Sequence, residues 1–443
     1  MVILMRIKQI SVKNLFGLFN HTIPFNLDKK ITIIHGPNGF GKTIILKFID
    51  GLFNRKYSIF FNIPFREFEI EFDNGDVISL VKKKLSERNV LILKINGKIY
   101  KDPFNLIDLK KRGFPLRFIE DILPVNRIGG DIWIWAPTGE KLNINEIFSR
   151  YSEEIIDSLP HSMRKYIKIE ENKQLQEYQK KLPIHLIETQ RLLKIPEEKP
   201  NRYTSRKVAY PLIAVVKEYS KELTINIESL LARFGELSQS LDRTFPVRLM
   251  KIKSSQILTK EDLREELNHL EEKRQHLREL GLLEKPADEL QFQEIDEDSK
   301  KVISVYVQDV KDKLRTFDEM AEKIDLLKTI LNDHFLFKEL FIDKQHGFVF
   351  RNRNDQIIEP SDLSSGEQHE LVLLYQLLFK VEPNSLILID EPEISLHVAW
   401  QKQFLNDIQR ISNIKDLDIL IATHSPQIIN ERWDMTVTLK GIN

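Results

Sequence analysis

Hydrophobic and polar positions follow three successive patterns along the chain. From Arg6 to about Arg191, short alternating apolar segments are joined by turn-forming residues, and hairpin turns are expected at Asp73-Asn74-Gly75 and Asn96-Gly97. From Val208 to Leu336, apolar residues recur at helical spacing among many charged ones. After Phe337, strand-like and helix-like segments alternate. The pattern predicts a stranded first part, a helical middle part and an alternating β/α ending.

The helical middle part has the pattern of solvated helices with one buried face. In Glu261–Leu280, four leucines share one helical face among glutamates, lysines and arginines: Leu263, Leu267, Leu270 and Leu277. Pro246 and the stretch Gly281–Pro286 are expected to interrupt this region, because proline lacks the amide proton of a helical hydrogen bond. We therefore expect several helices folded back on one another rather than one continuous coiled coil.

A glycine-rich loop, Gly36-Pro37-Asn38-Gly39-Phe40-Gly41-Lys42-Thr43, lies between the apolar strand Ile31–Ile34 and an apolar helix from Ile44. It fits the pattern G-x-x-x-x-G-K-[ST] in the strand–loop–helix context that this pattern requires. Backbone N–H groups of such a loop surround a polyphosphate, the lysine adds positive charge and the threonine hydroxyl binds magnesium. The loop predicts binding of ATP and Mg²⁺ by Asn38, Gly39, Gly41, Lys42 and Thr43, with Thr43 also a metal ligand.

Paired acids follow the apolar segment Ser385–Ile389, which reads as a buried parallel strand. Such a strand delivers its last residues to the edge of the sheet where ligands bind. Asp390 is the expected magnesium ligand, and Glu391 is the expected catalytic base that polarises the water attacking the γ phosphate. The alternative is a plain helix start, since Asp-Glu-Pro also suits a helix N-terminus. The glycine-rich loop upstream favours the nucleotide site.

A third motif, Leu363-Ser364-Ser365-Gly366-Glu367-Gln368, precedes a helical apolar run. It places small residues and free N–H groups at a helix N-terminus, which suits a second phosphate contact. Ser364 and Glu367 also fit a capping box, and both roles are compatible. The motif resembles the ABC ATPase signature sequence. With the other motifs, it makes the chain similar to ABC-type ATPases of the SMC, RecF and OLD group.

This resemblance implies an α/β fold in which an ABC ATPase head, a mixed sheet with helices, carries an inserted helical arm. The expected parts are an N-terminal head lobe at 1–207, the arm at 208–336 and a C-terminal head lobe at 337–443. In that group, the signature of one subunit closes over ATP held by the other. Ser364, Ser365 and Gly366 would therefore act on a partner's ATP, in a homodimer or a higher oligomer.

Two further positions match the same group. Gln190, in Leu186-Ile187-Glu188-Thr189-Gln190-Arg191, corresponds to the glutamine that contacts magnesium and the attacking water. His424, in Ala422-Thr423-His424-Ser425-Pro426, corresponds to the switch histidine, so both are expected at the catalytic site. A lone glutamine or histidine is usually structural. It is their order relative to the other motifs that supports the assignment.

The segments Asp390-Glu391-Pro392-Glu393 and Leu396-His397, with the final Thr-His-Ser-Pro, resemble OLD-like prokaryotic AAA ATPases more than SMC or transporter ATPases. Val398 stands where that branch commonly has proline. About 320 residues separate the glycine-rich loop from the signature, which disfavours a transporter ATPase. About 19 residues follow His424, so we expect no Toprim nuclease domain. Any effector chemistry is then expected in a separate polypeptide.

Two functions remain open at this point. The first is an ATP-dependent switch of prokaryotic antiviral defence that controls a separate nuclease or toxin, similar to the ATPases of Septu- or PARIS-type systems. The second is a RecF- or SMC-like repair ATPase that clamps DNA. A neighbouring effector gene would favour the first, and salt-sensitive DNA binding would favour the second.

Composition narrows these possibilities only slightly. Lys plus Arg and Asp plus Glu both number 66, so attraction to DNA would need a local patch such as Lys82-Lys83-Lys84, which also suits a protected strand edge. The chain has no cysteine, which excludes disulfides and cysteine-based zinc sites. Its apolar runs are strand-sized, well below the roughly 20 residues of a membrane helix. A cytoplasmic protein without membrane contact is expected.

Overall fold

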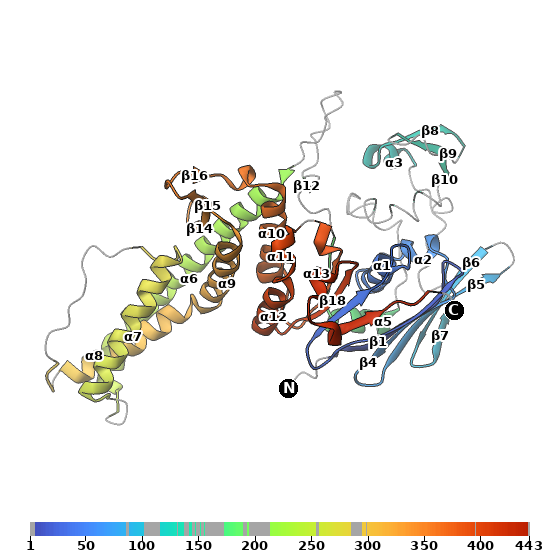
Figure 1. Cartoon of the computed structure of the whole chain (residues 1–443). Coiled ribbons are helices and arrows are strands. Elements are labelled where there is room, and N and C mark those ends of the chain that lie inside the picture. The colour runs from blue at the N-terminus through green and yellow to red at the C-terminus, as the bar shows by residue number, and fades with distance from the viewer. Residues whose placement is uncertain are drawn as a thin grey trace. The chain divides into compact units, whose positions relative to one another are not determined.

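The computed structural model describes residues 5–85, 88–101, 116–130, 132–136, 141–143, 147, 151, 155, 172–188, 193–194, 213–253, 257–284, 295–297, 299–394 and 396–441. The chain forms two compact units (Figure 1). The first contains Met1–Thr189 and Val381–Asn443, and the second contains Gln190–Lys380. The signature motif therefore groups with the helical middle part. The expected division into three parts, with boundaries at 207 and 336, stays a prediction.

The core of the first unit is built from two sheets. A six-stranded antiparallel sheet has the order β2-β1-β4-β5-β6-β7. Its strands are β1 (Ile7–Leu15), β2 (Phe19–Pro24), β4 (Glu67–Phe72), β5 (Val77–Leu85), β6 (Arg88–Ile95) and β7 (Lys98–Lys101). The turns expected at Asp73-Asn74-Gly75 and Asn96-Gly97 join β4 to β5 and β6 to β7, which confirms both hairpins. Alternating burial along β4 reflects one face turned toward the core.

The second sheet of this unit is parallel, with the order β11-β17-β18-β3-β19. Its strands are β11 (Ile184–Ile187), β17 (Leu386–Asp390), β18 (Asp418–Thr423), β3 (Ile31–His35) and β19 (Thr436–Thr438). β17 is buried along its whole length, as expected for a strand covered on both faces. Because β3, β17 and β18 run parallel, the residues that follow them meet at one edge of the sheet.

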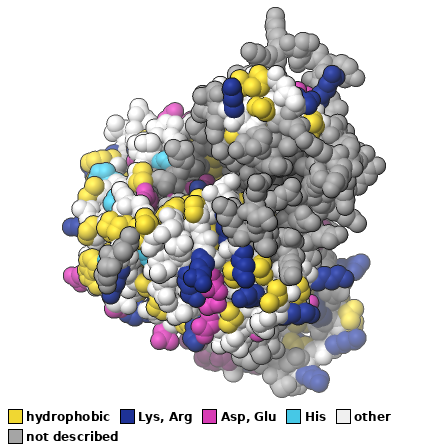
Figure 2. All heavy atoms as spheres, turned by 90° about the vertical axis from the view of Figure 1, so that its right-hand side faces the viewer, with side chains coloured by type: hydrophobic (Ala, Val, Ile, Leu, Met, Phe, Trp, Pro, Cys, Tyr) yellow, Lys and Arg dark blue, Asp and Glu magenta, His cyan; other side chains and the backbone are white. Residues whose placement is uncertain are grey.

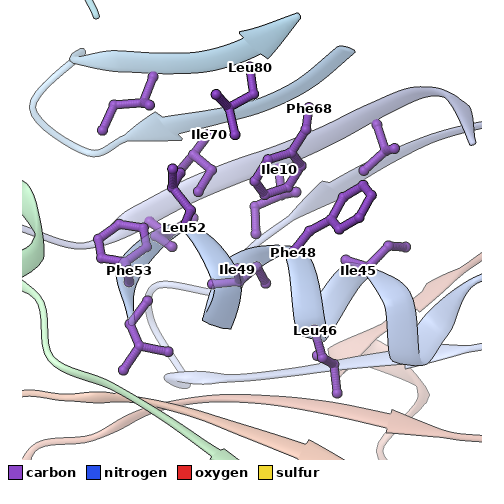
Figure 3. Packing of buried hydrophobic residues seen from close by; sticks show 14 of the residues in the cluster. Ile10, Ile45, Leu46, Phe48, Ile49, Leu52, Phe53, Phe68, Ile70 and Leu80 are labelled. Atoms are coloured by element: carbon purple, nitrogen blue, oxygen red, sulfur yellow. The ribbon is translucent and has the colours of Figure 1, made fainter. Parts of the chain in front are cut away.

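Helix α1 (Lys42–Phe53) packs between the two sheets. Figure 3 shows Phe48 and Leu52 directed toward strands of the antiparallel sheet and Leu46 directed away from it, and Phe48 contacts Phe68 with ring centroids 5.4 Å apart. The same buried cluster includes Leu388 and Leu420 of the parallel sheet. Burying an apolar residue of this size stabilises the fold by about 1.5–3 kcal/mol. This packing holds the start of α1 against the edge where β3 and β17 end.

Smaller elements complete the first unit. Three strands form a separate antiparallel sheet of order β10-β9-β8. These strands are β8 (Val125–Gly129), β9 (Ile132–Trp135) and β10 (Lys141–Asn143). The helices are α2 (Ser58–Asn62), α3 (Arg117–Ile122), α5 (Lys173–Lys181), α11 (Val398–Gln401), α12 (Phe404–Lys415) and α13 (Pro426–Ile429).

The second unit is mainly helical (Figure 1). Its first four helices are α6 (Val215–Lys251), α7 (Lys260–Glu279), α8 (Ser299–Arg315) and α9 (Asp318–His334). They lead into the antiparallel strands β14 (Lys338–Asp343), β15 (Gly347–Asn352) and β16 (Ile357–Ile358), and then into α10 (Ser365–Tyr375) and a π-helical turn (Gln376–Lys380). The short strands β12 (Leu193–Lys194) and β13 (Ile213–Ala214) also pair. Several folded-back helices are therefore confirmed.

The break expected at Pro246 is wrong. Helix α6 passes through this residue and ends at Lys251. In the turn before Pro246, side chains supply donors, since Thr244 Oγ1 at 3.2 Å and Arg248 Nη2 at 2.6 Å both donate to the Leu241 carbonyl. The second expected interruption is confirmed, because α7 ends just before Gly281, whose φ is +76°. Across the part of the chain that the structure describes, no helix is long and apolar enough to cross a membrane.

Candidate nucleotide site

The glycine-rich loop connects the end of β3 to the start of α1. Gly39 and Gly41 have φ of +85° and +89°, a region that side-chain-bearing residues rarely adopt. A Cβ on Gly41 would also lie 2.4 Å from Leu15 Cδ2 of β1. The loop is held from the other side by His21 of β2, whose Nε2 lies 2.9 Å from the Phe40 carbonyl oxygen. Its backbone is therefore shaped by two strands of the antiparallel sheet.

Lys42 turns back toward the loop that precedes it. Its Nζ donates to the carbonyls of Gly36 at 2.7 Å and Pro37 at 3.2 Å, and the side chain is only 4% exposed. The ammonium group is thus held beneath the exposed loop tip, where Asn38 and Gly39 lie. A buried cation bound only to carbonyl oxygens suits an added anionic partner such as a phosphate.

Thr43 and Asp390 meet across the edge of the parallel sheet. Thr43 Oγ1 donates to Asp390 Oδ1 at 3.0 Å, although 347 residues separate them in sequence. Burial raises the pKa of Asp390, and the Glu391 charge adds to this effect, while the Thr43 hydrogen bond and Lys47 oppose it. A buried carboxylate beside a hydroxyl is an arrangement of oxygen ligands that Mg²⁺ prefers.

Glu391 has an unusual backbone conformation. Its φ is +43°, although it is not a glycine and is followed by Pro392. Its backbone N–H donates to the Ala422 carbonyl of β18 at 2.8 Å, which fixes this turn. Backbone strain of this kind is found mostly at functional sites. The turn places Glu391 directly after the buried Asp390, at the end of β17.

His424 follows β18 and lies beside two glutamates. Its Nδ1 is 3.0 Å from Glu393 Oε1 and 3.9 Å from Glu391 Oε1. Glu393 also accepts hydrogen bonds from Thr423 Oγ1 at 2.7 Å and the backbone N of His424 at 2.9 Å. The His424 ring therefore lies within ion-pair distance of the Glu393 carboxylate, which its own backbone N–H also contacts.

Glu393 is the functional residue that sequence reasoning missed. It belongs to the Asp-Glu-Pro-Glu segment, but nothing in the local spacing connects it to a histidine 31 residues later. Gln401 further fixes this loop, since its amide donates to the Glu393 and Leu396 carbonyls, both at 3.2 Å. The histidine and its carboxylate are thus held by the parallel sheet and by Gln401, the last residue of the short helix α11.

The signature motif lies in the second unit, at the start of α10. Ser364 caps this helix, and the capping box with Glu367 is confirmed. Ser364 and Ser365 are exposed, and Gly366 is partly exposed. The helix N-terminus therefore presents small side chains and unpaired N–H groups to solvent, as an anion contact requires.

Comparison with known proteins decides the family. A family model described as the AAA ATPase domain matches residues 5–429, which is nearly the whole chain. The chain belongs to the AAA ATPase domain family. The predicted fold class, an α/β P-loop ATPase head with an inserted helical segment, is confirmed by this match and by the sheet topology.

Individual relatives of this AAA ATPase are distant. Protein ea59 of Escherichia phage lambda is 30% identical over 112 residues, which cover 24% of this chain and 19% of ea59. The match thus spans about a fifth of that relative's length. A Pyrococcus furiosus Smc head domain with an extended coiled coil, bound to the C-terminal domain of ScpA, is 10% identical. It covers 99% of this chain and 94% of its own, with a TM-score of 0.33.

An SMC head domain from Thermotoga maritima is also 10% identical, over 98% of this chain and 95% of its own, with a TM-score of 0.32. The family assignment rests on the sequence match alone.

The residues of this AAA ATPase fit ATP with Mg²⁺. Lys42 and the glycine backbone suit the phosphates, while Thr43 and Asp390 provide two oxygen ligands. Among the described residues, no group of three or more His, Asp or Glu side chains forms a metal cluster. A metal held by two protein oxygens together with phosphate and water oxygens is characteristic of Mg²⁺. Gln190, the expected third contact, lies outside the described residues.

Proposed function

We propose that this AAA ATPase is an ATP-hydrolysing switch whose heads pair on ATP and whose nucleotide state controls a separate effector protein. The observation that carries the proposal is the convergence of five residues at one edge of the parallel sheet. Lys42 and Thr43 follow β3, Asp390 ends β17 and Glu391 comes directly after it, and His424 follows β18. Binding groups and acid–base groups thus meet where ligands bind in α/β sheets.

The chemistry follows from the roles of these side chains. Lys42 binds the β and γ phosphates, and bound Mg²⁺ would neutralise charge that develops on them. Glu391 orients the attacking water and accepts its proton. His424, whose ring lies beside Glu393, would contact the γ phosphate. These residues position the attacking water and stabilise the charge on the phosphates, which is what phosphoryl transfer requires of a protein.

Head pairing is proposed to depend on the signature motif. Ser364, Ser365 and Gly366 are accessible at the start of α10 and resemble a motif that contacts a partner's ATP. ATP would then join two heads, and hydrolysis would separate them. The signature shares its compact unit with helices α6 to α9, so the nucleotide state can bias whatever protein these helices bind.

Direct DNA binding has less support. Lys82, from the cluster Lys82-Lys83-Lys84, donates to the carbonyls of Phe60, Phe61 and Ile63 and is therefore occupied inside the fold. On the described surface visible in Figure 2, lysines and arginines are scattered among acidic and hydrophobic side chains. We therefore favour control of an effector, a nuclease or toxin of antiviral defence, over a DNA clamp.

The first experiment compares wild-type protein with Glu391→Gln and Lys42→Ala. Glu391→Gln is expected to hydrolyse ATP at least about 100-fold more slowly, because the water loses its base, and to accumulate as an ATP-bound dimer. Lys42→Ala is expected not to bind ATP. Hydrolysis is measured as phosphate release and dimerisation by analytical ultracentrifugation. Wild-type hydrolysis by Glu391→Gln would show that Glu391 is not the base.

The partner is identified with the same trapped variant. Glu391→Gln protein is purified from its native host with ATP present, and Lys42→Ala serves as the matched control. A stoichiometric nuclease or toxin that is specific to the trapped variant supports the switch. Nuclease-resistant DNA that is released by raised salt, without a protein partner, would instead favour the clamp.

A further inference from the structure

The carboxylate of Glu367 connects the signature serine to strand β14. Its Oε2 accepts hydrogen bonds from Ser364 N and Ser364 Oγ, both at 2.8 Å, and from Lys338 Nζ at 2.7 Å. Its Oε1 accepts a second bond from Lys338 Nζ at 2.8 Å. A capping box needs only the serine and the glutamate, so Lys338 is an addition to the motif.

Glu367 is buried and charged. Its side chain is 10% exposed. Burial alone would raise the pKa of Glu367, but Lys338 and the hydrogen bonds from Ser364 outweigh this effect and hold the pKa below its ordinary value. An ionised carboxylate therefore lies directly behind the exposed Ser364. The ammonium group of Lys338 is the cation that compensates it.

This arrangement bears on how Ser364 can bind phosphate. A serine hydroxyl has one proton, and here the proton is donated to Glu367. A phosphate oxygen accepts hydrogen bonds, so Ser364 must turn its proton away from Glu367 to bind one. The negative charge of Glu367 would also repel an approaching polyphosphate. Lys338 makes both the rotation of the Ser364 proton and the approach of the polyphosphate less unfavourable. It neutralises the Glu367 carboxylate and keeps both of its oxygens hydrogen-bonded.

We propose that Lys338 is a positioning residue of the signature: by neutralising Glu367, it releases the Ser364 hydroxyl for the phosphate of ATP held by a second copy of this chain. The inference rests on the proposed head pairing. Lys338 acts through Glu367 and needs no contact with the nucleotide. The incoming group is identified by its chemistry, a polyphosphate with several acceptor oxygens.

The position of Lys338 also ties the signature to the helical arm. It is the first residue of β14, four residues after the end of α9 at His334. His334 itself pairs with Glu370, one helical turn beyond Glu367 on α10. A hydrogen bond from His334 and an ion pair from Lys338 thus join the end of α9 and the start of β14 to consecutive turns of the signature helix. A displacement of α9 would therefore move Lys338 and, through Glu367, change the contacts of Ser364.

The test measures the ATP concentration that gives half-maximal dimer in the full-length Glu391→Gln background. Adding Lys338→Met is expected to raise this concentration about tenfold, roughly the effect of losing one charge-assisted hydrogen bond. Lys338→Arg is expected to restore it to within about twofold, because the positive charge is kept. Lys344→Met, in the same hairpin, is the matched control and leaves it unchanged.

A double variant separates positioning from folding. Adding Glu367→Gln to Lys338→Met removes the uncompensated charge and is expected to restore dimerisation. A merely structural role would leave the double variant as weak as Lys338→Met, which would overturn the proposal. Equal dimerisation of Lys338→Met and its parent would overturn it too. If the Glu391→Gln parent itself fails to dimerise, the proposed head pairing is wrong, which is a distinguishable outcome.

Discussion

At the scale of single residues, Glu393 and His424 illustrate how the site is oriented. Glu393 is 9% exposed, and its Oε1 accepts hydrogen bonds from Thr423 Oγ1 and the His424 backbone N and lies 3.0 Å from His424 Nδ1. Within the described residues, its Oε2 is buried without a hydrogen-bond partner, which is costly. The fold therefore keeps this carboxylate beside the histidine despite incomplete hydrogen bonding. We propose that this arrangement serves to orient His424.

Replacing Glu393 by glutamine is expected to lower kcat for ATP hydrolysis about tenfold and to leave the KM for ATP unchanged. A neutral amide lacks the negative charge that Glu393 places 3.0 Å from His424 Nδ1, whereas the phosphate-binding loop is untouched. Steady-state phosphate release measures both constants. The exposed Glu431→Gln is the control. An unchanged kcat would contradict the orienting role.

At the scale of elements, Lys82 of strand β5 caps the C-terminal end of helix α2. Its Nζ lies 2.9–3.0 Å from three carbonyl oxygens, of Phe60, Phe61 and Ile63, which the short helix leaves without intrahelical partners. It also lies 5.5 Å from the centroid of the Phe65 ring. Burial lowers the pKa of Lys82. A sequence cluster that suggests DNA binding therefore contains a structural cap.

Lys82→Met is expected to destabilise the fold by about 1–3 kcal/mol, because three carbonyl groups lose a charged donor. Urea unfolding followed by circular dichroism measures the change. Lys83→Met is the matched control, since the neighbouring Lys83 is exposed, and is expected to change stability by less than about 0.5 kcal/mol. Equal effects of the two substitutions would show that the cap contributes nothing specific.

At the scale of the whole molecule, the proposed head pairing divides each working site between two chains. Lys42, Asp390, Glu391 and His424 belong to the first compact unit, and Ser365 belongs to the second. If the signature acts on a partner's ATP, a chain with a defective loop and a chain with a defective signature can together form one intact site.

Mixing Lys42→Ala with Ser365→Arg protein is therefore expected to recover up to about half of the wild-type ATPase activity, whereas each variant alone is inactive. Ser365→Arg blocks the signature but leaves the Ser364–Glu367 capping box in place. Phosphate release over a range of mixing ratios measures the recovery. Mixing Lys42→Ala with Glu391→Gln is the control, because both changes affect the same half-site. Recovery there, or none in the first mixture, would contradict the shared site.

The sequence by itself determined the elements and the motifs that lie within them. The glycine-rich loop, the apolar run before Asp390 and the capping box at Ser364 depend on neighbouring residues, so spacing and residue type suffice. Local patterns also predicted the two hairpins and the folded-back helices. Pro246 is the exception, since helix α6 continues through it and side chains of Thr244 and Arg248 donate to the nearby Leu241 carbonyl.

Only the tertiary structure decided which distant side chains work together. Thr43 meets Asp390 because parallel strands end at one edge. Glu393 reaches His424 across 31 residues, and Lys338 reaches Glu367 across 29. Each pair depends on strand order and on helix packing against the sheets. A local pattern carries no information on either, because these contacts are set by burial of the whole core.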